Sequence, residues 1–171
     1  GEKMHVDMHD LAINPDDPDH MINGSDGGAY QTFDRGESWQ FLNTHAVGQF
    51  YNVAIERDRY DYRVAGGLQD NGSWVGPSRT GRDTEGDTSV PPTAITNEDW
   101  QFLLWGDGFH VAFDPTDPNV LYAEWQGGNL TRINLATGDR MRVAPLQAEG
   151  GPRFRFNWNA PFFVSEHDPT V

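Results

Sequence analysis

Short apolar runs separated by polar turns recur along this chain. Four runs can be aligned, at 11–13, 53–55, 111–113 and 163–165, and their starts lie 42, 58 and 52 residues apart. The first, third and fourth lead into turns that contain Pro and Asp, whereas the second leads into a polar turn without proline. Apolar stretches this short, bounded by Pro, Asp and Gly, predict β-strands rather than helices.

The segments that follow each run repeat as well. A second strand and then a glycine-rich corner are predicted three times, at 21–28, 63–67 and 120–128. The segment 37–42 is matched at five of six positions by 98–103, both of which contain Trp-Gln-Phe-Leu. A repeat of 40–60 residues with about four short strands is typical of a β-propeller blade. A β-sandwich of unrelated hairpins is the alternative, but it would not place the same tetrapeptide at equivalent points.

The repeat predicts an all-β fold, a propeller segment of about three four-stranded antiparallel blades. The blade units are 11–52, 53–110 and 111–162, with a loop insertion at 77–97 and the start of a further blade at 163–171. Closed propellers use about four to eight blades. We therefore expect the remaining blades to come from a longer chain or from neighbouring subunits.

Charge limits the partners of this chain. Its 26 acidic and 12 basic residues give a net charge of −14, which makes nucleic acid a poor candidate partner. Cysteine is absent, so neither disulfides nor thiolate chemistry is expected. No apolar run is long enough for a membrane span.

Polar residues recur where each unit enters its first strand. Four residues upstream of the aligned runs, every residue is a carboxylate or a carboxamide. In an antiparallel blade this entry lies at the same end as the corner between strands two and three. The predicted ligand-binding residues at this end are His5, His9, Gln49, Asp70, Asn71, Asp107, Asn157 and Asn159. The alternative is that these groups only cap strands and bind water.

Four tryptophans stand near the same loops: Trp74, Trp105, Trp125 and Trp158. Exposed Trp beside amides and carboxylates suits carbohydrate or peptide binding. Tryptophans in propellers also pack between blades, and packing is the expectation for each of the four.

A metal site is a further hypothesis for the N-terminal segment. If 5–9 is extended, His5, Asp7 and His9 share one side of the chain, and two imidazoles with a carboxylate can hold a transition metal. The alternative is that the histidines are structural and pair with carboxylates. No other cofactor is expected.

Paired carboxylates are the chemistry that could support catalysis. Asp7 or Asp10, together with Asp70 or Asp107, could serve as acid and base if they face each other across a cleft. The catalytic candidates are therefore Asp7, Asp10 and Asp107.

One turn also carries a family resemblance. The pattern Thr32-x-Asp34-x-Gly36-x-Ser38-Trp39 resembles the Asp-box of bacterial-neuraminidase-type repeats. Together with the segments 9–15, 26–30, 66–74, 106–109 and 155–159, it resembles the sortilin-type, glycosyl-hydrolase-like propellers of bacteria, which are related to xyloglucanases. In the xyloglucanases, catalytic aspartates lie on loops entering the inner strands, which would correspond to the 7–10 region.

The resemblance implies a structural Asp-box and a secreted, periplasmic or cell-surface location. Family functions range from glycan hydrolysis to protein binding. We expect a binding or scaffold module for protein or glycan at the loop end of the blades. The alternative is a glycoside-hydrolase-like segment that uses paired aspartates.

Overall fold

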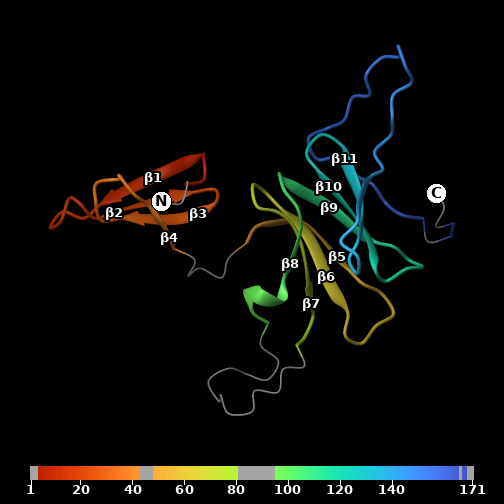
Figure 1. Cartoon of the computed structure of the whole chain (residues 1–171), viewed down its shortest axis with the longest axis horizontal. Coiled ribbons are helices and arrows are strands. Elements are labelled where there is room, and N and C mark those ends of the chain that lie inside the picture. The colour runs from red at the N-terminus through yellow and green to blue at the C-terminus, as the bar shows by residue number, and fades with distance from the viewer. Residues whose placement is uncertain (1–3, 43–47, 81–94, 166, 169–171) are drawn as a thin grey trace. The chain divides into compact units, whose positions relative to one another are not determined.

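The regular secondary structure of the described part of the chain is almost entirely β-strand. The computed structural model describes residues 4–42, 48–80, 95–165 and 167–168. Their strands form three antiparallel sheets of four strands each, accompanied by one short 3-10 helix, η1 (Asn97–Asp99). The sheets can be followed in Figure 1. The prediction of an all-β fold with four-stranded antiparallel, blade-like sheets is confirmed. The blade bounds stay a prediction, and residues 81–94 of the expected insertion lie outside the described residues.

The chain divides into two compact units, Gly1–Gly48 and Gln49–Val171. The first unit contains one sheet, in which neighbouring strands follow chain order: β1 (Met8–Ile13), β2 (Met21–Ser25), β3 (Gly28–Thr32) and β4 (Gln40–Phe41). The apolar run at 11–13 falls inside β1, and the second strand predicted within 21–28 corresponds to β2.

The second unit contains two sheets with the same strand order. The first has β5 (Phe50–Ile55), β6 (Arg63–Leu68), β7 (Gly72–Pro77) and β8 (Gln101–Leu104), and the other has β9 (Gly108–Phe113), β10 (Val120–Trp125), β11 (Asn129–Asn134) and β12 (Arg140–Arg142). Strand β9 packs against β5 and β6. The buried core between these sheets consists of Ala65, Val75, Leu103, Leu121, Ala123 and Ile133.

The turn between β3 and β4 is organised by its own side chains. Asp34 accepts hydrogen bonds from the Ser38 hydroxyl at 2.5 Å, the Thr32 hydroxyl at 2.6 Å and the Ser38 backbone N–H at 2.9 Å. The bonds from Ser38 and Thr32 lower the pKa of Asp34 from 3.8 to about 2. Gly36 adopts a φ of 89°, and the Trp39 ring lies against it. This geometry is what a structural turn requires, while the family assignment of the turn stays a prediction.

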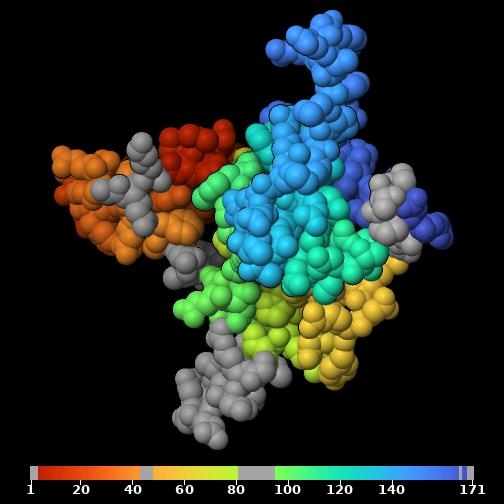
Figure 2. Space-filling view, turned by 45° about the vertical axis from the view of Figure 1, so that its right-hand side comes forward, coloured from red at the N-terminus to blue at the C-terminus, as the bar shows by residue number. Residues whose placement is uncertain are grey.

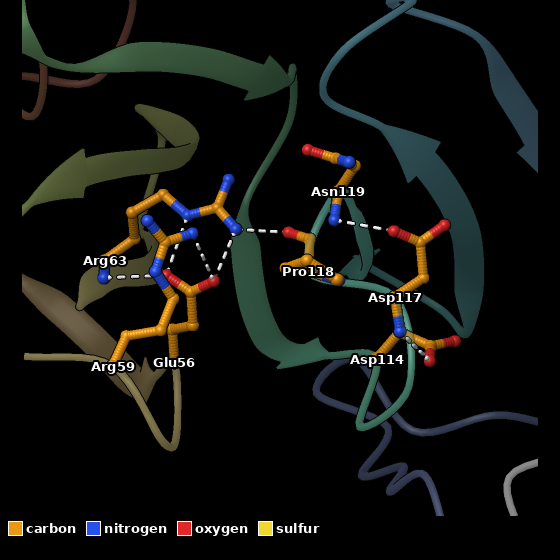
Figure 3. Close-up of polar contacts among 7 residues, drawn as sticks. All are labelled: Glu56, Arg59, Arg63, Asp114, Asp117, Pro118 and Asn119. Atoms are coloured by element: carbon orange, nitrogen blue, oxygen red, sulfur yellow. Dashed lines mark hydrogen bonds and ion pairs between the residues drawn. The ribbon is translucent and has the colours of Figure 1, made fainter. Parts of the chain in front are cut away.

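An ion pair in the β5–β6 turn holds an arginine that hydrogen-bonds to the other sheet of the second unit (Figure 3). Arg63 donates from Nε and Nη2 to Glu56, at 2.9 and 2.7 Å, and Nη2 also donates to the Pro118 carbonyl in the β9–β10 turn. The Glu56 side chain is only 5% exposed, and the hydrogen bonds from Arg63 lower the pKa of its carboxyl. The equivalent residues Asn14 and Asp114 instead accept backbone N–H groups of their own turns. The turn without proline is therefore stabilised by an ion pair.

One position on the second strand of each sheet differs in the size of its side chain. It is occupied by Gly24 in β2, Gly67 in β6 and Glu124 in β10. A Cβ on Gly67 would overlap the backbone of Gly108 and Phe109, whereas a Cβ on Gly24 would meet nothing within 4 Å. Close packing of β9 on β6 thus depends on the missing side chain of Gly67.

Replacing Arg63 with alanine should leave the buried Glu56 carboxylate without the guanidinium that donates two hydrogen bonds to it. We expect the free energy of unfolding to fall by about 2–4 kcal/mol. Arg59→Ala is the matched control, because Arg59 lies 3.6 Å from the same carboxylate but is 53% exposed, and its loss should cost less than about 0.5 kcal/mol. Urea unfolding followed by tryptophan fluorescence measures both variants, and equal losses would contradict the prediction.

A methyl group at position 67 should force β6 and β9 apart. We expect Gly67→Ala to lower the free energy of unfolding by about 2 kcal/mol or more, since overpacking against backbone cannot relax through a side chain. Gly24→Ala is the matched control at the same register position, with an expected change within about 1 kcal/mol. Thermal unfolding of both variants provides the comparison, and a Gly67 variant as stable as the wild type would refute the packing argument.

Candidate functional site

Each first strand is irregular near its start, at the end of the sheet where strands two and three also connect. We call this the corner end. The pairing register of the first strand shifts between Met8 and Asp10 in β1, between Phe50 and Asn52 in β5, and opposite Glu124 in β9. Bulges of this kind re-aim side chains at the rims of sheets. Because the bulge recurs in all three sheets, each corner end has one residue whose side chain is redirected by a bulge.

Two of the bulge residues contact the corner of their own sheet. The His9 Nε2 atom contacts the Asp26 carboxylate in the first unit. In the second unit, the Tyr51 hydroxyl donates to Gln69 at 2.7 Å, and its ring lies 4.9 Å from that of Phe109. His9 is thus a histidine paired with a carboxylate, as the structural interpretation expected.

Asp107 connects the corner ends of the second unit. Its Oδ1 accepts the backbone N–H of Asp70 at 3.0 Å, and its Oδ2 accepts the indole N–H of Trp158 at 2.9 Å. Its own backbone N–H donates to the Gln126 side chain at 2.7 Å. Both carboxylate oxygens therefore hold other parts of the chain in place.

Asp70 and Asn71 shape the corner between β6 and β7. Asp70 has a φ of 59°, a left-handed conformation that Asp tolerates better than most residues, and the third sheet has Gly127 at the same place. The Asn71 side chain donates to the Gln69 carbonyl, while the Asn71 carbonyl accepts the indole N–H of Trp74. These two predicted ligand-binding residues have a clear structural role.

The four tryptophans divide into two classes. Trp74 and Trp125 are half-buried in strands, as the packing expectation requires. Trp105 and Trp158 are 77% and 63% exposed, so the expectation of packing is wrong for them. Both stand outside the strands: Trp105 lies between β8 and β9, and Trp158 lies in the segment that follows β12. Trp105 rests on Phe102, with ring centroids 4.6 Å apart.

The other predicted residues lie in both units. In the second, Gln49, Asn157 and Asn159 are exposed and stand outside the strands. In the first, Asp10 lies inside β1, and its side chain accepts the backbone N–H of Leu11 at 2.8 Å. The candidates Asp7 and Asp10 belong to the first unit, and Asp107 belongs to the second.

The predicted metal ligands are not brought together. Asp7 has a φ of 60° and β1 begins only at Met8, so the segment is not the extended strand that the metal hypothesis required. The His5 ring contacts the neighbouring Val6 carbonyl. Within the described part of the chain, His5, Asp7 and His9 do not place three ligand atoms within 4.8 Å of one another.

Glu124 is a site residue that the sequence did not reveal. Its side chain is 1% exposed, and one carboxylate oxygen accepts the Gly128 backbone N–H at 3.2 Å. Burial raises its pKa from 4.5 to about 6, against the opposing effect of backbone N–H groups of Gly128, Ala160 and His110. In the sequence, only its equivalence in register to Gly24 and Gly67 could have indicated that it faces a neighbouring segment, here the one that includes Ala160.

Comparison with solved structures shows a distant likeness. No protein-family model matches the chain, and no curated protein matches it either. A solved structure of the GH74 xyloglucanase from Xanthomonas campestris aligns over 81% of this chain with 16% identity and a TM-score of 0.33. The chain spans 22% of the length of that enzyme. The predicted link to Asp-box and sortilin-type propellers stays a prediction.

Among the described residues, no helix is long and apolar enough to cross a membrane. The expected secreted or surface location, the absence of nucleic-acid partners and the completion of the fold by further blades stay predictions.

Glu124 should make the second unit less stable at neutral pH than in mild acid. Because its pKa is raised in the folded state, its contribution to stability is full below about pH 4.5 and is lost as the pH rises through 6. We expect the free energy of unfolding of the wild type to fall by about 2 kcal/mol between pH 4 and 7, and we expect Glu124→Gln to abolish this fall.

Urea unfolding at several pH values measures this effect. Glu149→Gln is the control, since Glu149 is an exposed residue and its loss should leave the pH profile unchanged. A Glu124→Gln protein with the wild-type pH profile would rule out Glu124 as the cause.

Proposed function

We propose that the second unit binds a glycan at its corner end, with Trp105 and Trp158 as the aromatic contacts. The observation that supports this most strongly is the exposure of both indoles: Trp158 donates to Asp107, and Trp105 precedes Asp107 by two residues in the chain. A sugar presents an apolar ring face and polar edges. It therefore suits a surface where flat aromatic rings lie beside carbonyls, amides and carboxylates.

The Trp158 indole is held in a defined position. Its N–H donates to Asp107, and its backbone carbonyl accepts the N–H of Gly127 at 2.9 Å. A ring positioned in advance loses little conformational freedom when a ligand packs on it. This favours Trp158 as a binding residue over an incidentally exposed side chain.

The hydrogen bonds of Asp107 favour binding over hydrolysis. A glycosidase needs one carboxyl group to transfer a proton to the substrate and a second to act as base or nucleophile. Asp107 accepts from Asp70 and Trp158 with its two oxygens, so its carboxylate supports the surface that we propose for binding.

Truncation of either indole should weaken glycan binding by about tenfold, which corresponds to about 1.4 kcal/mol. The measurement is binding of the wild type, Trp105→Ala and Trp158→Ala to a panel of immobilised neutral and acidic polysaccharides. Phe33→Ala is the control, because Phe33 is 61% exposed but lies in the β3–β4 turn of the first unit. Trp158→Phe tests the indole hydrogen bond separately, since it keeps an aromatic ring.

Two results would overturn the proposal. One is that no polysaccharide on the panel binds the wild type. The other is that both alanine variants bind as the wild type does while remaining folded, as judged by circular dichroism.

A further inference from the structure

Basic residues are concentrated in one part of this acidic chain. The segment 129–156 contains five of the 12 basic residues, Arg132, Arg140, Arg142, Arg153 and Arg155, but only two of the 26 acidic ones, Asp139 and Glu149. Its formal charge is therefore +3 in a chain whose net charge is −14. An anionic ligand would find its most favourable local field here.

Two of these arginines line a groove in the second unit. The groove has a volume of about 270 Å³, and its walls include Arg142 from β12, Gln147, Arg153, Phe154 and Phe156. Figure 2 shows the segment that follows β12, in blue, standing out from the third sheet. The ring of Phe156 lies against Gly128, where a Cβ would overlap it. The absence of a side chain at Gly128 thus gives the ring its place.

The two arginines of the groove are not neutralised by carboxylates. Arg63 lies against Glu56 in a two-point ion pair, but within the described residues neither Arg142 nor Arg153 forms an ion pair. Both are exposed, as are Phe154 at 56% and Phe156 at 42%. The groove therefore presents guanidinium donors beside accessible aromatic rings.

The groove adjoins the surface assigned to glycan binding. Gly127 lines the groove, and its backbone N–H donates to the carbonyl of Trp158 at 2.9 Å. A chain of sugars lying along Trp158 could therefore place a neighbouring unit in the groove.

We propose that this groove binds the uronate unit of an acidic polysaccharide. The inference rests on the proposed function and specifies its ligand. A uronate combines an apolar ring face with a carboxylate, which matches phenylalanine rings beside arginines that can bind a carboxylate through two N–H groups. Pockets for drug-sized ligands start at about 300 Å³, so a groove of this size fits a single sugar ring.

An acidic peptide is the competing anionic ligand. Continuity with Trp158 and the two exposed phenylalanines favour a ligand that offers ring faces at every unit. A polyglutamate chain offers carboxylates alone.

The test compares two forms of one polymer. Binding of the full chain to polygalacturonate and to its methyl-esterified form is measured by calorimetry, together with binding to polyglutamate. We expect polygalacturonate to bind at least about tenfold more tightly than the esterified form, and Arg142→Gln and Arg153→Gln each to lose about fivefold or more of that affinity. Added salt should weaken the preference for the charged form.

Arg140→Gln is the matched control, since Arg140 is also an exposed arginine of β12 but does not line the groove. It should keep the wild-type preference. Equal binding of the two polymer forms, or unchanged binding by both groove variants, would overturn the uronate inference. If binding to a neutral polymer still depends on Trp105, the proposed function survives that result. Binding of polyglutamate as tightly as polygalacturonate would instead indicate a peptide site.

Discussion

The carboxylate of Asp107 holds the corner ends of the second unit in register. One oxygen accepts from the β6–β7 corner and the other from the Trp158 indole, while the Asp107 backbone bonds to the Gln126 side chain. These contacts join segments separated by 37 and 51 residues. A buried or half-buried carboxylate is stable in such a place because it accepts hydrogen bonds on both oxygens. The exposed indole keeps its position for the same reason.

The two ends of the sheets have different roles. At one end, short turns are closed by Asn14, Asp114 and the side chains around Asp34. At the same end Arg63, paired with Glu56, donates to the Pro118 carbonyl of the neighbouring sheet. At the other end, bulges and corners direct side chains outward. The repeat preserves the backbone at both ends, and the chemistry of the corner ends differs from sheet to sheet. Binding surfaces commonly arise in this way, on loops that a rigid sheet positions.

The register position shared by Gly24, Gly67 and Glu124 shows how one backbone site takes different roles. Gly67 permits backbone contact with Gly108, whereas Glu124 places a carboxylate beside the segment after β12 that includes Ala160. The first arrangement gains close packing, and the second retains a titratable group at a cost in stability near neutral pH. The same topology therefore allows close backbone packing in one sheet and a contact whose stability depends on pH in the next.

The sequence by itself determined the strands, their turns and their grouping into four-stranded sheets, because alternating short apolar runs and Pro, Asp and Gly turns act locally. It also located the corner residues, including Asp70 and Asp107. Only the tertiary structure decided which side chains are exposed and which form hydrogen bonds. Trp105 and Trp158 are exposed, and the Asp107 carboxylate accepts a hydrogen bond from Trp158. Glu124 is buried, and its pKa is raised. Exposure and pKa depend on neighbours that are distant in the chain, and a local pattern does not specify those neighbours.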